Sequence, residues 1–323
     1  MAASKASAAA ADKKTIAAEE RRKKLILIKN NRALYVMILL PIIYFILFKY
    51  IPMTNIAIAF KDYNIFAGTW ESPWANPLGK YFIQAFSSAE FQRALWNTIN
   101  LNVLDLVFSF PAPIIVAIML NELTFKKFKR VTQTILYMPH FLSWIVIAGL
   151  AMQIFAPETG MVNVLLRHMG FESVPFLNDS GHWIATYVTL GVWQSAGWNT
   201  IIYLAAITGI DTELYEAAEV DGATRFRKIW HITLPGIRPT IVTLLILQMG
   251  RMLQVAFDRP YALANYLVMD VADVISTYVY RVGIESQQFA LSTAVGVFQS
   301  VVCVIFLLVA NVIAKRLGED GIW

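Results

Sequence analysis

The sequence has 323 residues, of which 57% are hydrophobic and only 15% are charged, and its mean hydropathy is +0.55. Soluble domains average about 25% charged residues, so this composition indicates a chain that is embedded in a lipid bilayer. The single cysteine excludes an internal disulfide framework and paired-cysteine metal motifs, and the histidines show no metal-binding spacing. The net charge of +5 forms no extended basic face, which argues against nucleic-acid binding.

Residues 1–30 are rich in alanine and then in charge, and they lack the apolar core of a signal peptide. We expect this stretch to be a cytoplasmic tail that is disordered or loosely helical. The remaining residues, 31–323, are predicted to form one membrane domain.

Six apolar stretches in this domain are long enough to cross a membrane, which takes about 20 residues. They are 33–60, 95–120, 131–156, 183–210, 239–257 and 289–314. The apolar stretch 260–269 is too short to span, so we expect it to be interfacial or re-entrant. With the N-terminus inside, 19 of the 27 lysine and arginine residues face the cytoplasm, as the positive-inside rule requires. The sequence therefore predicts an all-α membrane protein with six transmembrane helices and both termini cytoplasmic.

The cytoplasmic loop over 211–238, between the fourth and fifth spans, has more helix-start and helix-stop signals than the other loops. Asp211 is a good cap for a short helix over 212–220, and Gly222 interrupts that helix. A second short helix over 224–231 is expected to stop at Pro235. The loop is therefore predicted to be two short helices joined at a glycine.

Seven residues of this loop follow a fixed spacing, which is EAA, three residues, G, nine residues, I, one residue and LP. They are Glu216, Ala217, Ala218, Gly222, Ile232, Leu234 and Pro235. The pattern resembles the signature loop of the permease subunits of binding-protein-dependent ABC importers. The segments LLPIIYFILFKYIPM, YMPHFLSW and ADVISTYVYRVG resemble the carbohydrate-uptake branch. Within it they look like the LplB-type polysaccharide permeases, a group that includes the alginate-importer permease.

The resemblance implies that the loop is a coupling helix that docks on an ATP-binding subunit. The implied docking residues are Glu216, Ala217, Ala218, Asp221, Gly222, Ile232, Leu234 and Pro235. A solvated helix face followed by a glycine turn is the alternative for the same residues. The implied partners are a second homologous permease subunit, two ATP-binding-cassette subunits and an extracytoplasmic solute-binding protein. The implied location is the bacterial cytoplasmic (inner) membrane.

Polar residues inside spans are costly in a bilayer, so they mark a candidate substrate pathway. In the fourth span the candidates are Trp193, Gln194, Trp198 and Asn199. Aromatic faces beside amides suit sugars, and helix packing is the alternative. Around the end of the fifth span the candidates are Gln248, Arg251, Gln254, Asp258 and Arg259, several of which would share one helix face.

Arg251 and Arg259 favour an acidic sugar, because the guanidinium group binds a carboxylate through two parallel donors. The alternative is that both arginines reach to the interface or pair with Asp258 and Asp270. Asp105 is the one acid within its span. We interpret it as a packing or gate residue that pairs with a neighbour, rather than as a proton site.

No GxxxxGK[ST] phosphate loop occurs, so ATP must be bound and hydrolysed by partner chains. The leading hypothesis is a permease subunit that imports an oligosaccharide, with an acidic one such as alginate or another uronate oligomer as the first candidate. It has no catalytic residues, metal or cofactor of its own. The alternatives are a secondary transporter, with Asp105 as a proton site, and an integral-membrane enzyme, for which the scattered acids give little support. Co-purification of the partner chains would separate these hypotheses.

Overall fold

The fold is that of a computed structural model, and the residues described are 27, 30–319 and 321–322. These residues are helical throughout, apart from loops and one isolated β-bridge between Lys61 and Trp74. The predicted all-α class is therefore confirmed. The predicted tail over 1–30 lies outside the described residues, except for Leu27 and Asn30. The chain divides into two compact units, residues 1–57 and 58–323.

The first unit is a long apolar helix with local changes of winding. It consists of α2 (Arg32–Phe45), the π-turn η1 (Ile46–Tyr50), α3 (Ile51–Met53) and the start of the 3-10 turn η2 (Thr54–Phe60). The stretch Arg32–Phe60 is long and apolar enough to cross a membrane, and its apolar residues are exposed along the whole of α2. Such a helix, apolar on all sides, suits lipid rather than water.

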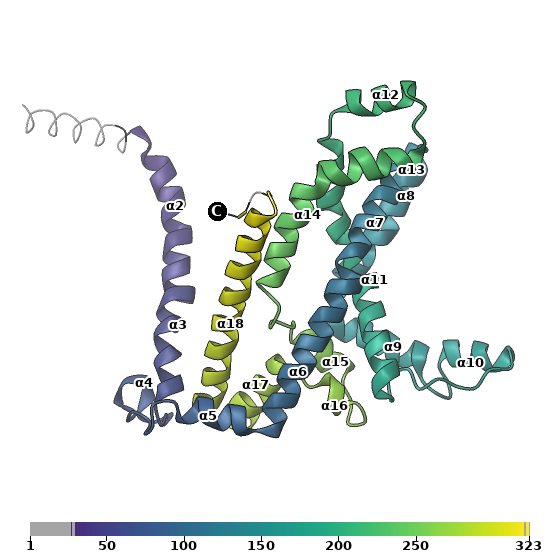
Figure 1. The fold of residues 1–323 in the computed structure, drawn as a ribbon. Coiled ribbons are helices and arrows are strands. Elements are labelled where there is room, and N and C mark those ends of the chain that lie inside the picture. The colour runs from purple at the N-terminus through teal and green to yellow at the C-terminus, as the bar shows by residue number, and fades with distance from the viewer. Residues whose placement is uncertain (1–26, 28–29, 320, 323) are drawn as a thin grey trace, which may run out of the picture. The chain divides into compact units, whose positions relative to one another are not determined.

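The second unit holds the remaining helices, which Figure 1 labels. They are α4 (Gly68–Glu71), α5 (Lys80–Ser87), α6 (Ala89–Leu104), η3 (Asp105–Ser109), α7 (Pro111–Asn121), α8 (Lys126–Tyr137), η4 (Met138–Phe141), α9 (Trp144–Phe155), α10 (Met161–His168), α11 (Ser180–Thr208), α12 (Thr212–Val220), α13 (Arg225–Lys228), η5 (Ile229–Thr233), α14 (Leu234–Met249), α15 (Asp258–Leu263), α16 (Met269–Ala272), α17 (Ile275–Tyr280), η6 (Arg281–Glu285) and α18 (Phe289–Arg316). The turns η3, η5 and η6 are π-turns, and η4 is a 3-10 turn.

Four helices among the described residues are long and apolar enough to span a membrane, and three of them continue through π-turns. They are Arg32–Phe60, Ala89–Asn121, Arg225–Met249 and Phe289–Arg316. A fifth span is present if the bent pair Lys126–Phe141 and Trp144–Phe155 counts as one. Helix α11 has the length of a span, with 29 residues, but it carries more polar side chains.

The third predicted span is wrong as a continuous helix. Its two halves meet at an angle of 102°. Pro139 lies in the 3-10 turn, and the Ser143 hydroxyl caps a new helix by accepting a hydrogen bond from the Val146 amide at 3.4 Å. A proline followed by a helix cap is a stop and restart signal, which the apolar composition of the stretch hid.

The expected bounds of the fifth span are also wrong at both ends. Pro235 does not stop the preceding short helix, because the π-turn η5 leads directly into α14 and the helix runs from Arg225 to Met249. A π-turn loosens the hydrogen-bond ladder next to a proline, which has no N–H to contribute. The helix then ends at Gly250, several residues before the predicted end at Phe257.

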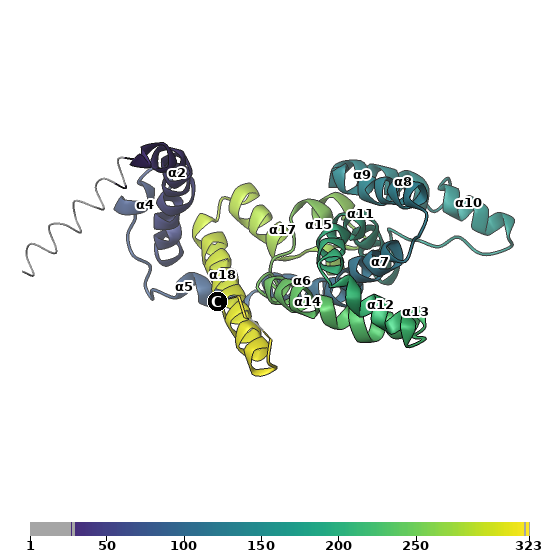
Figure 2. The same cartoon turned by 90° about the horizontal axis from the view of Figure 1, so that it is seen from above.

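Helix α11 lies at the centre of the second unit, where it packs on η3, α7, α8 and α14 (Figure 2). The Thr200 hydroxyl donates to the Pro113 carbonyl of α7 at 3.2 Å. A Cβ atom at Gly197 would collide with the Leu136 carbonyl of α8, so the glycine lets the two backbones approach closely. These contacts fix the helix that supplies one wall of the site described below.

The segment expected to be interfacial or re-entrant, 260–269, is partly buried, and Tyr266 and Leu267 in it are exposed. Leu263 and Val268 are buried in a core with Trp183 and Tyr187 of α11. The Trp183 indole donates to the Leu263 carbonyl at 2.9 Å. These contacts anchor the two ends of the segment's exposed turn to the core of this unit.

Candidate functional site

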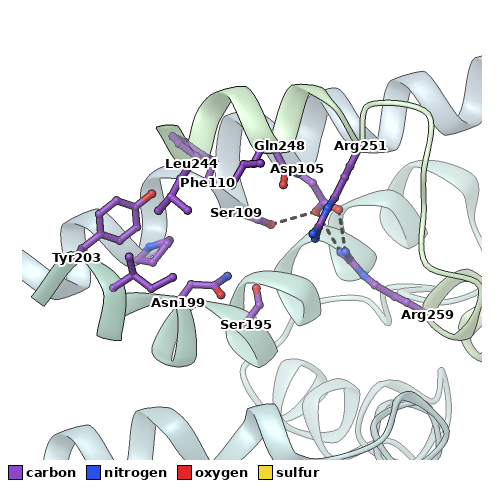
Figure 3. A pocket seen from close by; sticks show the side chains of 13 residues that line it. Asp105, Ser109, Phe110, Ser195, Asn199, Tyr203, Leu244, Gln248, Arg251 and Arg259 are labelled. Atoms are coloured by element: carbon purple, nitrogen blue, oxygen red, sulfur yellow. Dashed lines mark hydrogen bonds and ion pairs between the residues drawn. The ribbon is translucent and has the colours of Figure 1, made fainter. Parts of the chain in front are cut away.

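A polar cavity of about 360 Å³ lies between the α6–α7 segment, α11 and the end of α14. It is lined by Asp105, Ser109, Phe110, Pro113, Ser195, Asn199, Ile202, Tyr203, Leu244, Leu247, Gln248, Arg251 and Arg259. Polar side chains reach it from η3, from α11, from the end of α14 and from α15 (Figure 3). The cavity is therefore formed by residues that are distant in sequence.

The two ends of the cavity differ in polarity. Helix α11 runs toward the 211–238 loop and α14 runs away from it, so Tyr203 and Leu244 are nearer to that loop than Ser195 and Arg251. Figure 1 shows α12 at one end of the second unit and α15 and α16 at the other. The apolar lining thus lies toward the loop, and the charged lining lies toward α15.

A buried ion pair between Asp105 and Arg259 closes the charged end. The two guanidinium terminal nitrogens contact the two carboxylate oxygens at 2.8 and 3.3 Å. The Ser109 hydroxyl donates to the same carboxylate at 3.0 Å. Asp105 begins the π-turn η3, and Arg259 lies in the first turn of α15. The pair therefore ties the second long helix to the segment that follows α14.

Three further contacts fix Arg259. Its Nη2 donates to the Tyr187 carbonyl at 2.6 Å, and its guanidinium lies 3.6 Å from the centre of the Tyr187 ring and 5.2 Å from that of Trp144. Gly191 offers the necessary space, because a Cβ atom there would collide with the guanidinium. The Arg259 side chain is only 11% exposed. A buried charge requires such compensation, since desolvation alone costs several kcal/mol.

Arg251 has the opposite environment. It follows the end of α14, its side chain is exposed, and Figure 3 shows it directed into the cavity. Among the residues that the structure describes, its guanidinium has no ion-pair or hydrogen-bond partner. Gln248 lies one helical turn earlier and lines the same cavity.

Four of the predicted pathway residues line the cavity, namely Asn199, Gln248, Arg251 and Arg259. Five others do not line it: Trp193, Gln194, Trp198, Gln254 and Asp258. Trp198 stacks on His140 at 4.7 Å between ring centres, and the Gln194 amide donates to the His140 carbonyl at 3.4 Å. The shared helix face expected for Arg251, Gln254 and Asp258 does not exist, because the helix ends at Gly250.

Sequence reasoning missed Ser109 and Tyr203 as cavity residues. Its alternative for Arg259 was a pair with Asp258 or Asp270, which the structure does not form, whereas the expectation that Asp105 pairs with a neighbour is met by Arg259. The true partners are separated by 154 positions. The signal that points to them is that each is a lone charge in or beside an apolar segment.

The 211–238 loop forms a second candidate site. Asp211 caps α12 by accepting a hydrogen bond from the Glu213 amide at 3.0 Å, and Gly222 has a φ of +70°, a conformation that favours glycine. The Tyr215 hydroxyl bonds the Thr233 hydroxyl at 2.9 Å, which ties α12 to η5. The short helix over 212–220 and the break at Gly222 are confirmed, whereas the second helix is not short but continues to Met249.

A second tie crosses the break. The Lys228 ammonium contacts the Glu219 carboxylate at 2.7 Å, and this hydrogen bond lowers the pKa of Glu219 below its ordinary value. Of the implied docking residues, Glu216, Ala217, Asp221, Gly222 and Pro235 are exposed, while Ala218, Ile232 and Leu234 are partly buried. The loop thus presents a fixed helix with a free outer face.

Comparison with known proteins shows the family of the chain. Residues 109–319 match the family described as binding-protein-dependent transport system inner membrane component. The chain is 43% identical over 290 residues to the protein LplB of Bacillus subtilis, covering 90% of this chain and 91% of that protein. It is 45% identical over 292 residues to the polygalacturonan/rhamnogalacturonan transport system permease protein YteP of the same organism, covering 90% of each.

A solved structure gives the same result for the fold. It is the crystal structure of a bacterial ABC transporter involved in the import of the acidic polysaccharide alginate. The similarity has a TM-score of 0.83 and 40% identity, and it covers 90% of this chain and 98% of that one. The same transporter type is also known in complex with an alginate pentasaccharide-bound periplasmic protein, again with a TM-score of 0.83. The chain therefore belongs to the family of binding-protein-dependent transport system inner membrane components, and it is a permease subunit of an ABC importer rather than an enzyme.

Proposed function

We propose that this chain forms half of the translocation pathway of an ATP-driven oligosaccharide importer in the bacterial cytoplasmic membrane. It works with a second homologous permease subunit, two ATP-binding-cassette subunits and an extracytoplasmic solute-binding protein. The bent pair α8–α9 and the polar helix α11 complete six spans with the four long apolar helices, and both termini are cytoplasmic. The similarity to a sugar-importing permease over 90% of the chain supports this assembly.

An acidic oligosaccharide such as a uronate oligomer is the proposed substrate class. Two kinds of support agree. The names of one relative and one solved structure refer to galacturonan and alginate, both of which are polymers of acidic sugars. The cavity contains a cation, Arg251, that has no partner in the described part of the chain, and it lies beside amides and hydroxyls that suit the neutral parts of a sugar.

The exposed face of α12 is the observation that carries the coupling role. Glu216 and Ala217 lie free on a helix that is capped at Asp211, broken at Gly222 and tied to η5 by Tyr215. The helix is thus held rigidly with no partner on its outer face among the described residues. We propose that it docks in the ATP-binding subunit, with Glu216 pairing with a basic residue there. ATP binding would then draw the loop inward and switch the permease between two states.

The test is ATPase coupling in the assembled complex of all five subunits in proteoliposomes. Glu216→Lys reverses the docking charge, and Gly222→Pro removes the positive φ that the break requires. Both variants should keep little of the ATPase stimulation that loaded binding protein causes. Glu172→Lys makes the same charge change at an exposed site outside the loop and should behave as wild type. Normal stimulation in both loop variants would overturn the docking role.

A further inference from the structure

Three charged side chains line the cavity, and they are chemically distinct. Asp105 and Arg259 neutralise each other through two contacts, whereas Arg251 has no partner among the described residues. The lining therefore carries a net charge of about +1 that is localised on one side chain. A lining of this kind attracts one carboxylate at one place, rather than anions in general.

Arg259 is unavailable to a substrate for reasons of geometry. Its two terminal nitrogens are engaged by Asp105 and by the Tyr187 carbonyl, and the Tyr187 ring covers one face of the guanidinium. Gly191 packs against the same group. A carboxylate that bound Arg259 would have to displace an intramolecular carboxylate that is already in place, which leaves Asp105 buried and unpaired.

Arg251 offers its whole donor fork. It projects into the cavity from the turn that follows α14, and Gln248, Asn199 and Ser195 line the cavity with it. The amides and the hydroxyl supply donors and acceptors for sugar hydroxyls, and the fork supplies two parallel donors for a carboxylate.

We propose that Arg251 is the specificity-determining residue that binds a carboxylate of the substrate, and that Asp105 and Arg259 form a positioning pair that removes a second cation from the cavity. This inference rests on the proposed acidic-oligosaccharide function. It assigns different roles to two arginines that sequence reasoning treated alike. It also predicts that removing Asp105 strengthens the preference for acidic over uncharged sugars, which a purely structural role for the pair does not predict.

The test measures binding of tetragalacturonic acid and of its methyl ester, which has the same length but no charge. The sample is the purified complex of both permeases and both ATP-binding subunits without binding protein, so the binding protein's own selectivity does not contribute. The wild type should prefer the acid. Arg251→Gln should weaken acid binding by tenfold or more, as expected for a hydrogen-bonded charge, with little change for the ester. Arg251→Lys should keep part of the preference.

Asp105→Asn should raise the ratio of acid affinity to ester affinity about fivefold, because it leaves the Arg259 charge uncompensated beside the cavity. The matched controls are Arg93→Gln and Glu172→Gln, which make the same charge changes at exposed sites away from the cavity. Neither should change the preference. Stronger salt dependence of acid binding in Asp105→Asn would be a second mark of the added charge.

The outcomes separate the two proposals. If the wild type prefers the acid and Arg251→Gln retains that preference, this inference is wrong while the proposed substrate class stands. If the wild type binds the two probes equally, or binds neither, the acidic-sugar proposal fails and this inference with it. If Asp105→Asn weakens binding of acid and ester alike, the pair has only a structural role and its assignment here is overturned.

Discussion

Gly191→Ala tests the buried ion pair by a change that touches neither of its members. The new methyl group would occupy the space of the Arg259 guanidinium, so the arginine must move away from Tyr187 and Asp105. Separating a buried pair costs about 3–5 kcal/mol, since it leaves a charge without compensation. The Asp105 side chain is 19% exposed at the cavity, so we expect the lower part of that range.

A loss of about 3 kcal/mol should lower the melting temperature by several degrees, since about 1 kcal/mol corresponds to roughly 2–4 °C in a protein of 150–250 residues and somewhat less in a larger one. The assay is scanning fluorimetry of the purified complex in detergent. Gly296→Ala is the matched control, because a Cβ atom there meets open space on the long helix α18. In an Arg259→Met background the effect of Gly191→Ala should largely disappear. Equal melting temperatures for the Gly191 and Gly296 variants would refute the reasoning.

Three further predictions follow from the packing and the loop. Gly197→Ala should lower the melting temperature of the complex more than Gly191→Ala does, because the new Cβ atom meets a backbone carbonyl that cannot move away by changing rotamer. A smaller decrease than in Gly191→Ala would contradict this. Trp183→Phe removes the donor to Leu263 and should raise amide exchange in 258–272 while leaving 289–316 unchanged, and equal rates in both segments would count against it. The carboxyl of Glu219 should titrate below its ordinary pKa of 4.5, so the tie to Lys228 is fully present above that value and is lost as pH falls through the lowered one. A carbon chemical-shift titration checks this, and the midpoint should return toward 4.5 in Lys228→Met.

The helices could be predicted from sequence where the local composition alone determines that a segment is helical or broken. Long apolar stretches and the break at Gly222 needed only local information, because a helix in lipid satisfies its own backbone and a positive φ favours glycine. The predicted helix bounds were wrong where a helix continued past a proline, or where a helix cap lay within an apolar stretch. Pro235 continues a helix through a π-turn, and the Ser143 cap divides an uncharged stretch that looked like one span.

The candidate site was less predictable, since it depends on residues from several elements that are distant in sequence. Arg251 and Gln248 were found because polar residues in apolar spans are few. The partner of Arg259 was not found, because its distance to Asp105 depends on how α15 folds back against α11. Helical periodicity also predicted that Gln254 lies on the same helix face as Arg251. This prediction was wrong because the helix ends at Gly250, before both residues.

ATP-driven uptake into proteoliposomes tests the central claim most directly. The sample is the full complex of this chain, its sister permease and two ATP-binding subunits, with binding protein outside and ATP inside. We expect labelled tetragalacturonic acid to accumulate only when ATP is present, its methyl ester to accumulate much less, and Gly222→Pro to stop accumulation. Uptake that needs no ATP, or that persists at the full rate in Gly222→Pro, would contradict the claim.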